Sequence, residues 1–174
     1  MWVFAYGSLL WDPGFTPVEQ LRADMPGHIR SFCMWSIHHR GTPETPGLVL
    51  ALDRGAGQCA GMALRVSDTD QHDVLAMLRE RELVSSAYEE VWVPLALADG
   101  RGVQAVTYMI NRDHPQYCPE LTLEDQAQVI ASAVGGRGPN PDYLYNTTRL
   151  LRDLGIPDPD LDWLETRVKQ ITGD

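Results

Sequence analysis

The segment Tyr88–Ala98, YEEVWVPLALA, carries an apolar residue at every second position in its latter part. Side chains of a β-strand alternate between two faces, so the positions from Val91 to Leu97 counted by twos form one apolar face. Asp99-Gly100 follows and is typical of a tight hairpin turn, and a second apolar run, Val103–Ile110, comes next. These features predict a β-hairpin with one face toward a hydrophobic core.

Further short apolar or β-branched runs, separated by glycine and proline, precede this hairpin and predict additional strands. They are Val3–Tyr6, Ile29–Ile37, Leu48–Leu52 and Gly61–Val66. Between the last of them and the hairpin, Ser67-Asp68 predicts the cap of a helix that runs to about Leu83.

The last third of the chain has helical periodicity instead. Thr122 predicts an N-cap, with Val134 facing inward and Gly135-Gly136 ending the helix. Asn140-Pro141 predicts the start of a second helix that ends near Gly155, and Leu161–Ile171 predicts a third. Together these segments predict an α+β fold, a small mixed β-barrel, closed or half-closed, with flanking helices and a helical C-terminal tail.

Length and composition narrow the class of protein. A chain of 174 residues, 44% of them apolar, builds one core of ordinary size, so we expect a single domain over residues 1–174. The formal charge of -10, with no run of lysine or arginine, argues against a nucleic-acid partner. No apolar stretch approaches the ~20 residues of a membrane span, and no export signal precedes the first strand, so we expect a cytoplasmic protein without membrane contact.

Three cysteines, Cys33, Cys59 and Cys118, are widely spaced and form no Cys-x-x-Cys pair. This spacing favours buried free thiols and predicts no metal site. The histidines do not change this interpretation, because the adjacent pair His38-His39 would point to opposite faces of a strand.

The first predicted helix ends on a carboxylate whose position is unusual. At 100° per residue, Glu82 lies about 80° around the helix from Val74, on the same side as Leu75 and Leu78, whereas Glu80 faces away. Two interpretations remain open. Either the helix frays before Glu82, which then lies in water or pairs with a neighbouring arginine, or Glu82 lines a cavity where desolvation would raise its pKa toward neutrality. In the second case it would serve as a general acid and base.

Tyr6-Gly7-Ser8-Leu9 follows the first strand, and a glycine at such a point allows successive backbone N–H groups to converge on a carboxylate or oxyanion. The same four residues are also compatible with an ordinary turn. They lack the further glycines and the lysine of a P-loop, which disfavours nucleotide binding.

Several motifs occur together, in an order and at spacings that are informative. They are Val3-Phe4-Ala5-Tyr6-Gly7-Ser8-Leu9-Leu10-Trp11, His39-Arg40-Gly41-Thr42-Pro43 with Pro46-Gly47, Arg81-Glu82, and Asn140-x-x-Tyr143-Leu144. In this combination the chain resembles the ChaC-like γ-glutamylcyclotransferase family over nearly its whole length. The resemblance implies a small β-barrel with flanking helices and cleavage of glutathione to 5-oxoproline and cysteinylglycine, with no metal or cofactor.

The resemblance also implies roles for particular residues. It makes Glu82 the catalytic acid and base, and it makes the first strand and its loop the segment that holds the substrate. That segment consists of Val3, Phe4, Ala5, Tyr6, Gly7 and Ser8.

Outside this segment, Tyr117 is a candidate for a phenol hydrogen bond to the substrate. Arg40 either pairs with the glycine-end carboxylate of glutathione or anchors its own loop. Two other functions stay open: a cyclotransferase for other γ-glutamyl amides or amines, and a non-catalytic small-molecule-binding regulatory protein of the same fold. The sequence makes no prediction of oligomeric state.

Overall fold

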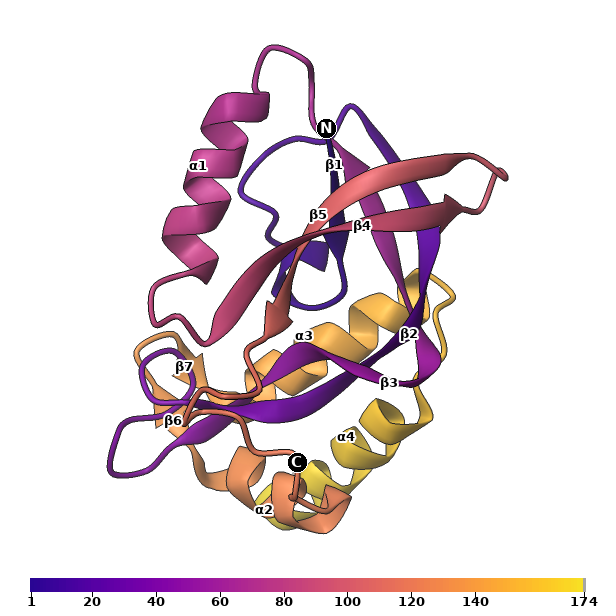
Figure 1. Ribbon diagram of the computed structural model, residues 1–174. Helices are drawn as coiled ribbons and strands as arrows, with labels where there is room; N and C mark the ends of the chain where they lie inside the picture. The colour runs from indigo at the N-terminus through magenta and orange to yellow at the C-terminus, as the bar shows by residue number, and fades with distance from the viewer. Residues whose placement is uncertain (174) are drawn as a thin grey trace. The chain divides into compact units, whose positions relative to one another are not determined.

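The computed structural model describes residues 1–173, which form two compact units. The first unit consists of Met1–Ser31 and Ala51–His114, and the second of Phe32–Leu50 and the chain from Pro115 onward. Figure 1 shows the elements, which in chain order are β1 Trp2–Ala5, the 3₁₀-helix η1 Ser8–Leu10, β2 Glu19–Ser36, β3 Gly47–Arg65, α1 Gln71–Glu82, β4 Tyr88–Leu97, β5 Gly102–Ile110, α2 Leu123–Ser132, β6 Val134–Gly135, β7 Gly138–Pro139, α3 Asn140–Asp153 and α4 Pro159–Thr172.

Five strands close into a barrel in the order β1-β3-β2-β4-β5. Strand β1 pairs antiparallel with β3 from Trp2↔Arg65 to Ala5↔Met62, and parallel with β5 at Trp2↔Ala105 and Val3↔Val106. Strands β4 and β5 form the predicted hairpin, whose turn contains Gly100 in the left-handed conformation at a φ of 89°. The expected mixed β-barrel is therefore confirmed, and it is closed.

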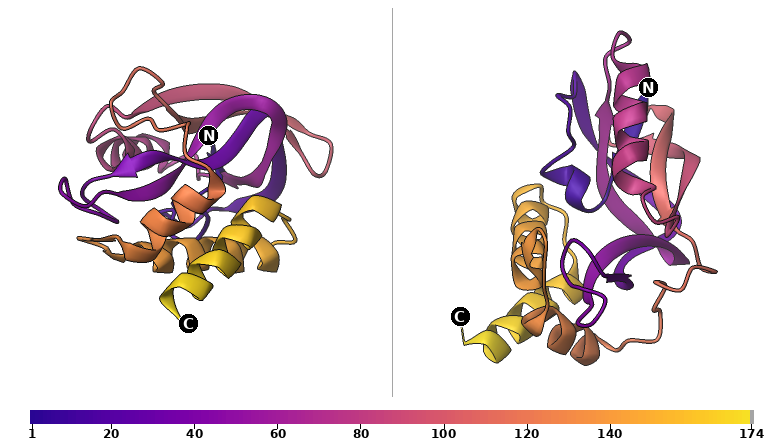
Figure 2. Two further views of the ribbon diagram at one scale, coloured as in Figure 1. Left: turned by 90° about the horizontal axis from the view of Figure 1, so that it is seen from below. Right: turned by 90° about the vertical axis from the view of Figure 1, so that its left-hand side faces the viewer.

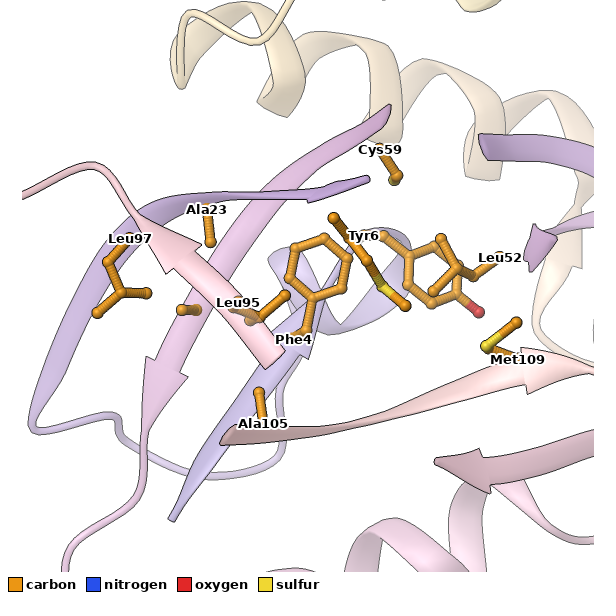
Figure 3. Packing of buried hydrophobic residues seen from close by; sticks show 11 residues of the cluster. Phe4, Tyr6, Ala23, Leu52, Cys59, Leu95, Leu97, Ala105 and Met109 are labelled. Carbon is orange, nitrogen blue, oxygen red and sulfur yellow. The ribbon is translucent and has the colours of Figure 1, made fainter. Parts of the chain in front are cut away.

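The barrel of the first unit is filled by side chains from every one of its strands. Phe4 and Tyr6 lie at its centre, between Leu52 and Met109 on one side and Leu95 and other hairpin residues on the other (Figure 3). The face of the hairpin predicted to be apolar packs against this cluster. A closed barrel of this size holds a packed core of side chains, so the interior itself offers no channel.

Helix α1 covers the outside of the same barrel. Val74 and Leu78 are buried against Val3, Val106 and other residues of β1 and β5 that point away from the interior. Figures 1 and 2 show α1 lying alongside these strands. Strand β1 is consequently buried on both faces, which explains why its sequence is apolar throughout and lacks strand alternation.

In the second unit, α2, α3 and α4 pack on one another (Figure 2). Helix α2 begins with a capping box, in which the Thr122 hydroxyl accepts from the Asp125 backbone N–H while the Asp125 side chain accepts from the Thr122 N–H. Buried leucines of α4, Leu161 and Leu164, face the helices beside them. The predicted helical tail is confirmed.

The His39–Gly47 motif, in this second unit, contains two places where the backbone approaches itself closely. A side chain at Gly41 would overlap the backbone of Gly47, and one at Gly47 would overlap the carbonyl of Arg40. Only glycine permits so close an approach at these two positions. The glycines of the motif thus have a structural explanation.

Several predicted boundaries differ from the structure for identifiable reasons. The two strands predicted at Leu48–Leu52 and Gly61–Val66 are one continuous strand, β3. Glycines in its middle, Gly55 and Gly57, interrupt the apolar pattern, but they face the side chain of Ile29 and the strand continues through them. Strand β2 likewise begins at Glu19, ten residues before the predicted start.

The predicted helix caps also need correction. Helix α1 begins after Asp70, because Ser67 and Asp68 bond Thr69 and Gln71 within a turn and do not cap the helix. Helix α2 ends at Ser132, which places Val134 in strand β6 with 56% of its surface exposed, so the prediction that Val134 faces inward is wrong.

At the start of α3, the N-cap position is Pro139 and not Asn140. The Asn140 side chain is fully buried and bonds the backbone of Leu48, accepting from its N–H at 2.7 Å and donating to its carbonyl at 2.8 Å.

Among residues 1–173, no helix is long and apolar enough to cross a membrane. The expectation of one domain over residues 1–174 stays a prediction.

Candidate active site

The site begins at the end of β1, where the chain leaves the barrel and enters η1. The Gly7 carbonyl accepts from the Leu10 N–H at 2.9 Å, and the Ser8 carbonyl accepts from the Asp12 N–H at 3.0 Å. The loop after β1 is therefore a closed, hydrogen-bonded turn. Ser8 is its half-buried member, between the buried residues Gly7 and Leu9.

Side chains of the predicted substrate-holding segment are mostly committed to the core. Val3, Phe4 and Ala5 are completely buried, and Tyr6 is 7% exposed. The Tyr6 hydroxyl donates to the backbone carbonyl of Tyr108 at 2.9 Å. Within this segment Ser8 alone has a polar side chain outside the core, so we expect ligand contacts from Ser8 and from backbone N–H groups around Gly7.

The backbone of this segment is held from both sides. Arg30 donates from Nη1 to the Tyr6 carbonyl at 2.7 Å and to the Ala60 carbonyl at 3.2 Å, so one guanidinium joins β1 and β3. Next to this point, a side chain at Gly61 would overlap the Ala5 carbonyl and lie 2.9 Å from the Phe4 ring. Gly61 therefore allows β3 to approach β1 where the loop begins.

Glu82 is the last residue of α1, and its side chain is 16% exposed. Glu80, two residues earlier, is exposed, so the predicted helical phase is confirmed. The helix does not fray before Glu82. The Arg81 Nε lies 3.1 Å from Glu82 Oε1, so the carboxylate pairs with a neighbouring arginine as the first interpretation allowed, but without the fraying which that interpretation assumed.

Arg81 also reaches the loop after β1. Its Nη2 donates to the Ser8 hydroxyl oxygen at 3.0 Å, and its Nη1 donates to the Asp12 carbonyl at 2.5 Å. The structure thus brings the loop and Glu82, two predictions made from separate parts of the sequence, to opposite ends of one guanidinium group.

Tyr108 of β5 is a further residue of the candidate site, which the sequence did not indicate. The residue is 2% exposed, and the pKa of its phenol is raised by burial and by the negative charges of Glu90 and Glu82. The phenol is therefore protonated at neutral pH, and it lies within electrostatic range of both carboxylates. The only signal in the sequence was a hydroxyl-bearing aromatic within an apolar strand, which many packing residues share.

Glu90 holds the end of α1 to the barrel. Arg79 donates from Nε and Nη2 to the two carboxylate oxygens of Glu90, each at 2.7 Å. This hydrogen-bonded pairing lowers the pKa of Glu90. The helical turn that carries Glu82 is thus attached to β4 as well as to the loop.

The other two predicted residues, Tyr117 and Arg40, belong to the second unit. Tyr117 is half-buried and forms an isolated antiparallel bridge with Met34. Arg40 donates to the Pro139 carbonyl at 3.0 Å and stacks over the Tyr143 ring at 5.6 Å, which favours the interpretation that it anchors its own loop. The role of Tyr117 stays a prediction.

Chemically, the described geometry combines three capacities. A largely buried carboxylate at the end of a helix can take and give a proton. Backbone groups of a tight turn can hold a carboxylate or an oxyanion. A protonated phenol within electrostatic range of the carboxylate adds a potential hydrogen-bond donor.

Solved structures define the class of fold. The chain has a γ-glutamylcyclotransferase fold: it superposes on a yeast γ-glutamyl cyclotransferase specific to glutathione with a TM-score of 0.88, over 98% of this chain and 96% of that one, at 22% sequence identity. At that identity the likeness concerns the fold alone.

Sequence comparison then gives the family. The model of the ChaC-like protein family matches residues 1–171, and the chain belongs to this family. It is 34% identical over 171 residues to the glutathione-specific γ-glutamylcyclotransferase of Escherichia coli strain K12, covering 98% of this chain and 74% of that protein. It is 33% identical to γ-glutamylcyclotransferase 2-3 of Arabidopsis thaliana, covering 98% and 89% respectively.

Proposed function

We propose that this protein is a glutathione-specific γ-glutamylcyclotransferase, which releases 5-oxoproline and cysteinylglycine from glutathione. Family membership supports the reaction class, and the names of relatives such as the Escherichia coli protein support the substrate. The observation that carries the proposal is the position of Glu82, a carboxylate only 16% exposed that one arginine connects to the Gly-Ser loop.

The reaction uses a nucleophile that the substrate provides. The α-amine of the γ-glutamyl group attacks its own γ-carbonyl carbon, a C–N bond forms to close the five-membered ring, and the original amide C–N bond breaks. The amine is an ammonium ion at neutral pH, so a base must first remove its proton. The departing nitrogen of cysteinylglycine must then receive one.

A single carboxylate between these two nitrogens can perform both transfers, and we assign this task to Glu82. The backbone of Tyr6, Gly7 and Ser8 holds the α-carboxylate and supports the developing oxyanion. Substrate orientation is the second requirement, because the amine must approach the carbonyl to roughly 3–3.5 Å. A rigid turn attached to the barrel suits this task better than a mobile loop.

The decisive experiment compares the wild type with Glu82→Gln, using glutathione in the presence of a chelator and following 5-oxoproline by chromatography. Glutamine keeps the size and hydrogen bonding of the side chain but cannot exchange the proton. We expect a loss of about 10²–10⁴-fold in turnover, the usual contribution of general acid–base catalysis. The matched control is Glu80→Gln, which removes the same charge from the exposed side of α1 and should leave turnover unchanged.

Wild-type turnover in Glu82→Gln would refute the assignment of this residue. Absence of 5-oxoproline with the wild-type protein would refute the reaction itself, in favour of a non-catalytic binding function. A panel of glutathione, γ-glutamyl-alanine and γ-glutamyl-lysine tests the substrate preference, and equal kcat/KM for all three would favour the broader cyclotransferase.

We also propose that the protein acts in the cytoplasm. In the described part of the chain all three cysteines are free thiols and buried, which is the usual condition in a reducing compartment.

A further inference from the structure

The Arg81 side chain makes more polar contacts than a surface ion pair would. The side chain is 16% exposed. Nη2 donates to the Ser8 hydroxyl oxygen at 3.0 Å, Nη1 donates to the Asp12 carbonyl at 2.5 Å and lies 3.5 Å from the Asp12 carboxylate, and Nε lies 3.1 Å from the Glu82 carboxylate. All three nitrogens of the group are therefore engaged with the loop or with Glu82.

The two loop residues that Arg81 contacts close the same turn. The Asp12 N–H donates to the Ser8 carbonyl, so Ser8 and Asp12 are joined by the backbone as well as through the guanidinium. A guanidinium is planar and its donors have a fixed geometry, so contacts at one edge constrain the other edge. Displacement of the turn would therefore displace the Arg81 Nε from Glu82.

The opposite end of the group is constrained too. Glu82 directly follows Arg81 on α1, and the preceding turn of the helix is attached to β4 by the Arg79–Glu90 pair. The turn that carries Glu82 is thus attached to the barrel, and the Glu82 carboxylate oxygen Oε1 lies 3.1 Å from the Arg81 Nε.

We propose that Arg81 is a positioning residue, which sets the separation between the Gly-Ser turn and the Glu82 carboxylate and does not itself bind the substrate. This inference rests on the proposed function, since it assigns the turn to the substrate and Glu82 to the proton. Proton transfer requires heavy atoms about 2.6–3.2 Å apart, and orientation errors near 1 Å can cost on the order of 10²-fold in rate. A rigid bridge between the two groups meets this requirement.

The nature of the contacts argues against a role in binding the substrate. A guanidinium typically recognises a carboxylate through two parallel N–H donors. Here both terminal nitrogens donate to the protein, to Ser8 and Asp12, and little of the side chain reaches solvent.

The test uses Arg81→Met, with Arg65→Met as the control. Both variants remove one arginine from the first unit, but Arg65 is 43% exposed and pairs with Glu19 of β2, not with the loop or with Glu82. We expect Arg81→Met to remain folded and to lose on the order of 10²-fold in kcat with a smaller change in KM. Arg65→Met should keep kcat and KM close to those of the wild type, because its partner Glu19 lies outside the site.

Two further variants separate positioning from a merely structural role. Arg81→Lys restores the charge but not the planar fork, so it should recover only part of kcat. In a double-mutant cycle with Ser8→Ala, the losses in kcat should be clearly less than additive, because both changes break the same bridge.

The possible outcomes are distinct. A rise in KM with unchanged kcat in Arg81→Met would show that Arg81 binds the substrate. Wild-type kcat and KM would show that Arg81 neither binds the substrate nor positions Glu82. Each of these results overturns the inference, but the proposed function stands if Glu82→Gln is inactive. Full additivity with Ser8→Ala overturns it as well. Activity of Glu82→Gln equal to the wild type would instead overturn the proposed function.

Discussion

Replacement of Gly61 by alanine tests how the barrel holds the loop that we assign to the substrate. An added methyl group would overlap the Ala5 carbonyl oxygen and lie 2.9 Å from two carbons of the Phe4 ring. Carbon atoms pack best at about 3.5–4.0 Å, so the ring must retreat by at least about 0.6 Å. The Ala5 carbonyl is backbone of β1 and has no rotamer through which to move away.

The expected cost has a part in stability and a part in activity. Overpacking of this kind costs about 1–3 kcal/mol, partly offset by about 0.4–1 kcal/mol because alanine restricts the unfolded chain. Displacement of β1 by a good fraction of an ångström at the entrance to the Tyr6-Gly7-Ser8 turn should lower kcat/KM by roughly 10- to 100-fold, given that a shift of 1 Å can cost on the order of 10²-fold.

The control is Gly102→Ala, on strand β5 of the same unit, where an added methyl group would meet nothing within 4 Å and φ is not positive. Unfolding in urea followed by tryptophan fluorescence gives the change in stability, and initial rates of 5-oxoproline release give kcat/KM. Gly102→Ala should be neutral or slightly stabilising and fully active. If Gly61→Ala matches the wild type in both measurements, the close approach of β3 to β1 does not position the loop and our reasoning is wrong.

Two predictions concern ionisable groups of the second unit. Burial opposes ionisation of Glu165, but hydrogen bonds from Lys169 and its other neighbours outweigh it and lower the pKa of Glu165 to about 2 from 4.5. A lowered carboxyl pKa stabilises the fold above pH 4.5, and this stabilisation decreases as the pH falls toward 2. Glu165→Gln should therefore lower the free energy of unfolding, measured in urea titrations, by up to about 3 kcal/mol at pH 7 and by less at pH 3.5. A difference in free energy that does not depend on pH would contradict this prediction. Burial, with a smaller effect of Cys33, raises the pKa of Cys118 to about 12 from 9, so the stability of the fold should decrease as the pH rises from 9 toward 12. At pH 8.5, Cys118 should react with iodoacetamide about 10³-fold more slowly in the folded than in the urea-unfolded protein, because less of the thiol is ionised. Mass spectrometry measures both rates. Equal rates in the two states would contradict the second prediction.

Much of the fold was accessible from local patterns. The alternation in Tyr88–Ala98 and the Asp99-Gly100 turn identified the hairpin, because strand periodicity and turn conformation depend on neighbouring residues. Helical periodicity identified the C-terminal helices for the same reason, although Val134 showed that an apolar residue can follow the end of a helix and be exposed. Boundaries failed where a residue's partner was remote, as with Asn140, whose side chain bonds Leu48 and does not cap α3.

The residues of the candidate site likewise include some that local sequence patterns identify and some that they do not. The sequence by itself placed Glu82 on the buried side of a helix, because the angle between residues of one helix follows from the backbone alone. It also singled out the Gly-Ser turn after the first strand.

Only the tertiary structure brought these two features together. The contact runs through Arg81 to Ser8, 73 positions away, and Tyr108 joins the site from a third segment of the chain. Such contacts depend on how strands and helix pack in the closed barrel, and no periodicity within a short segment encodes them. Local sequence patterns thus identified the loop and the carboxylate, whereas the contact between them through Arg81 arises only in the folded barrel.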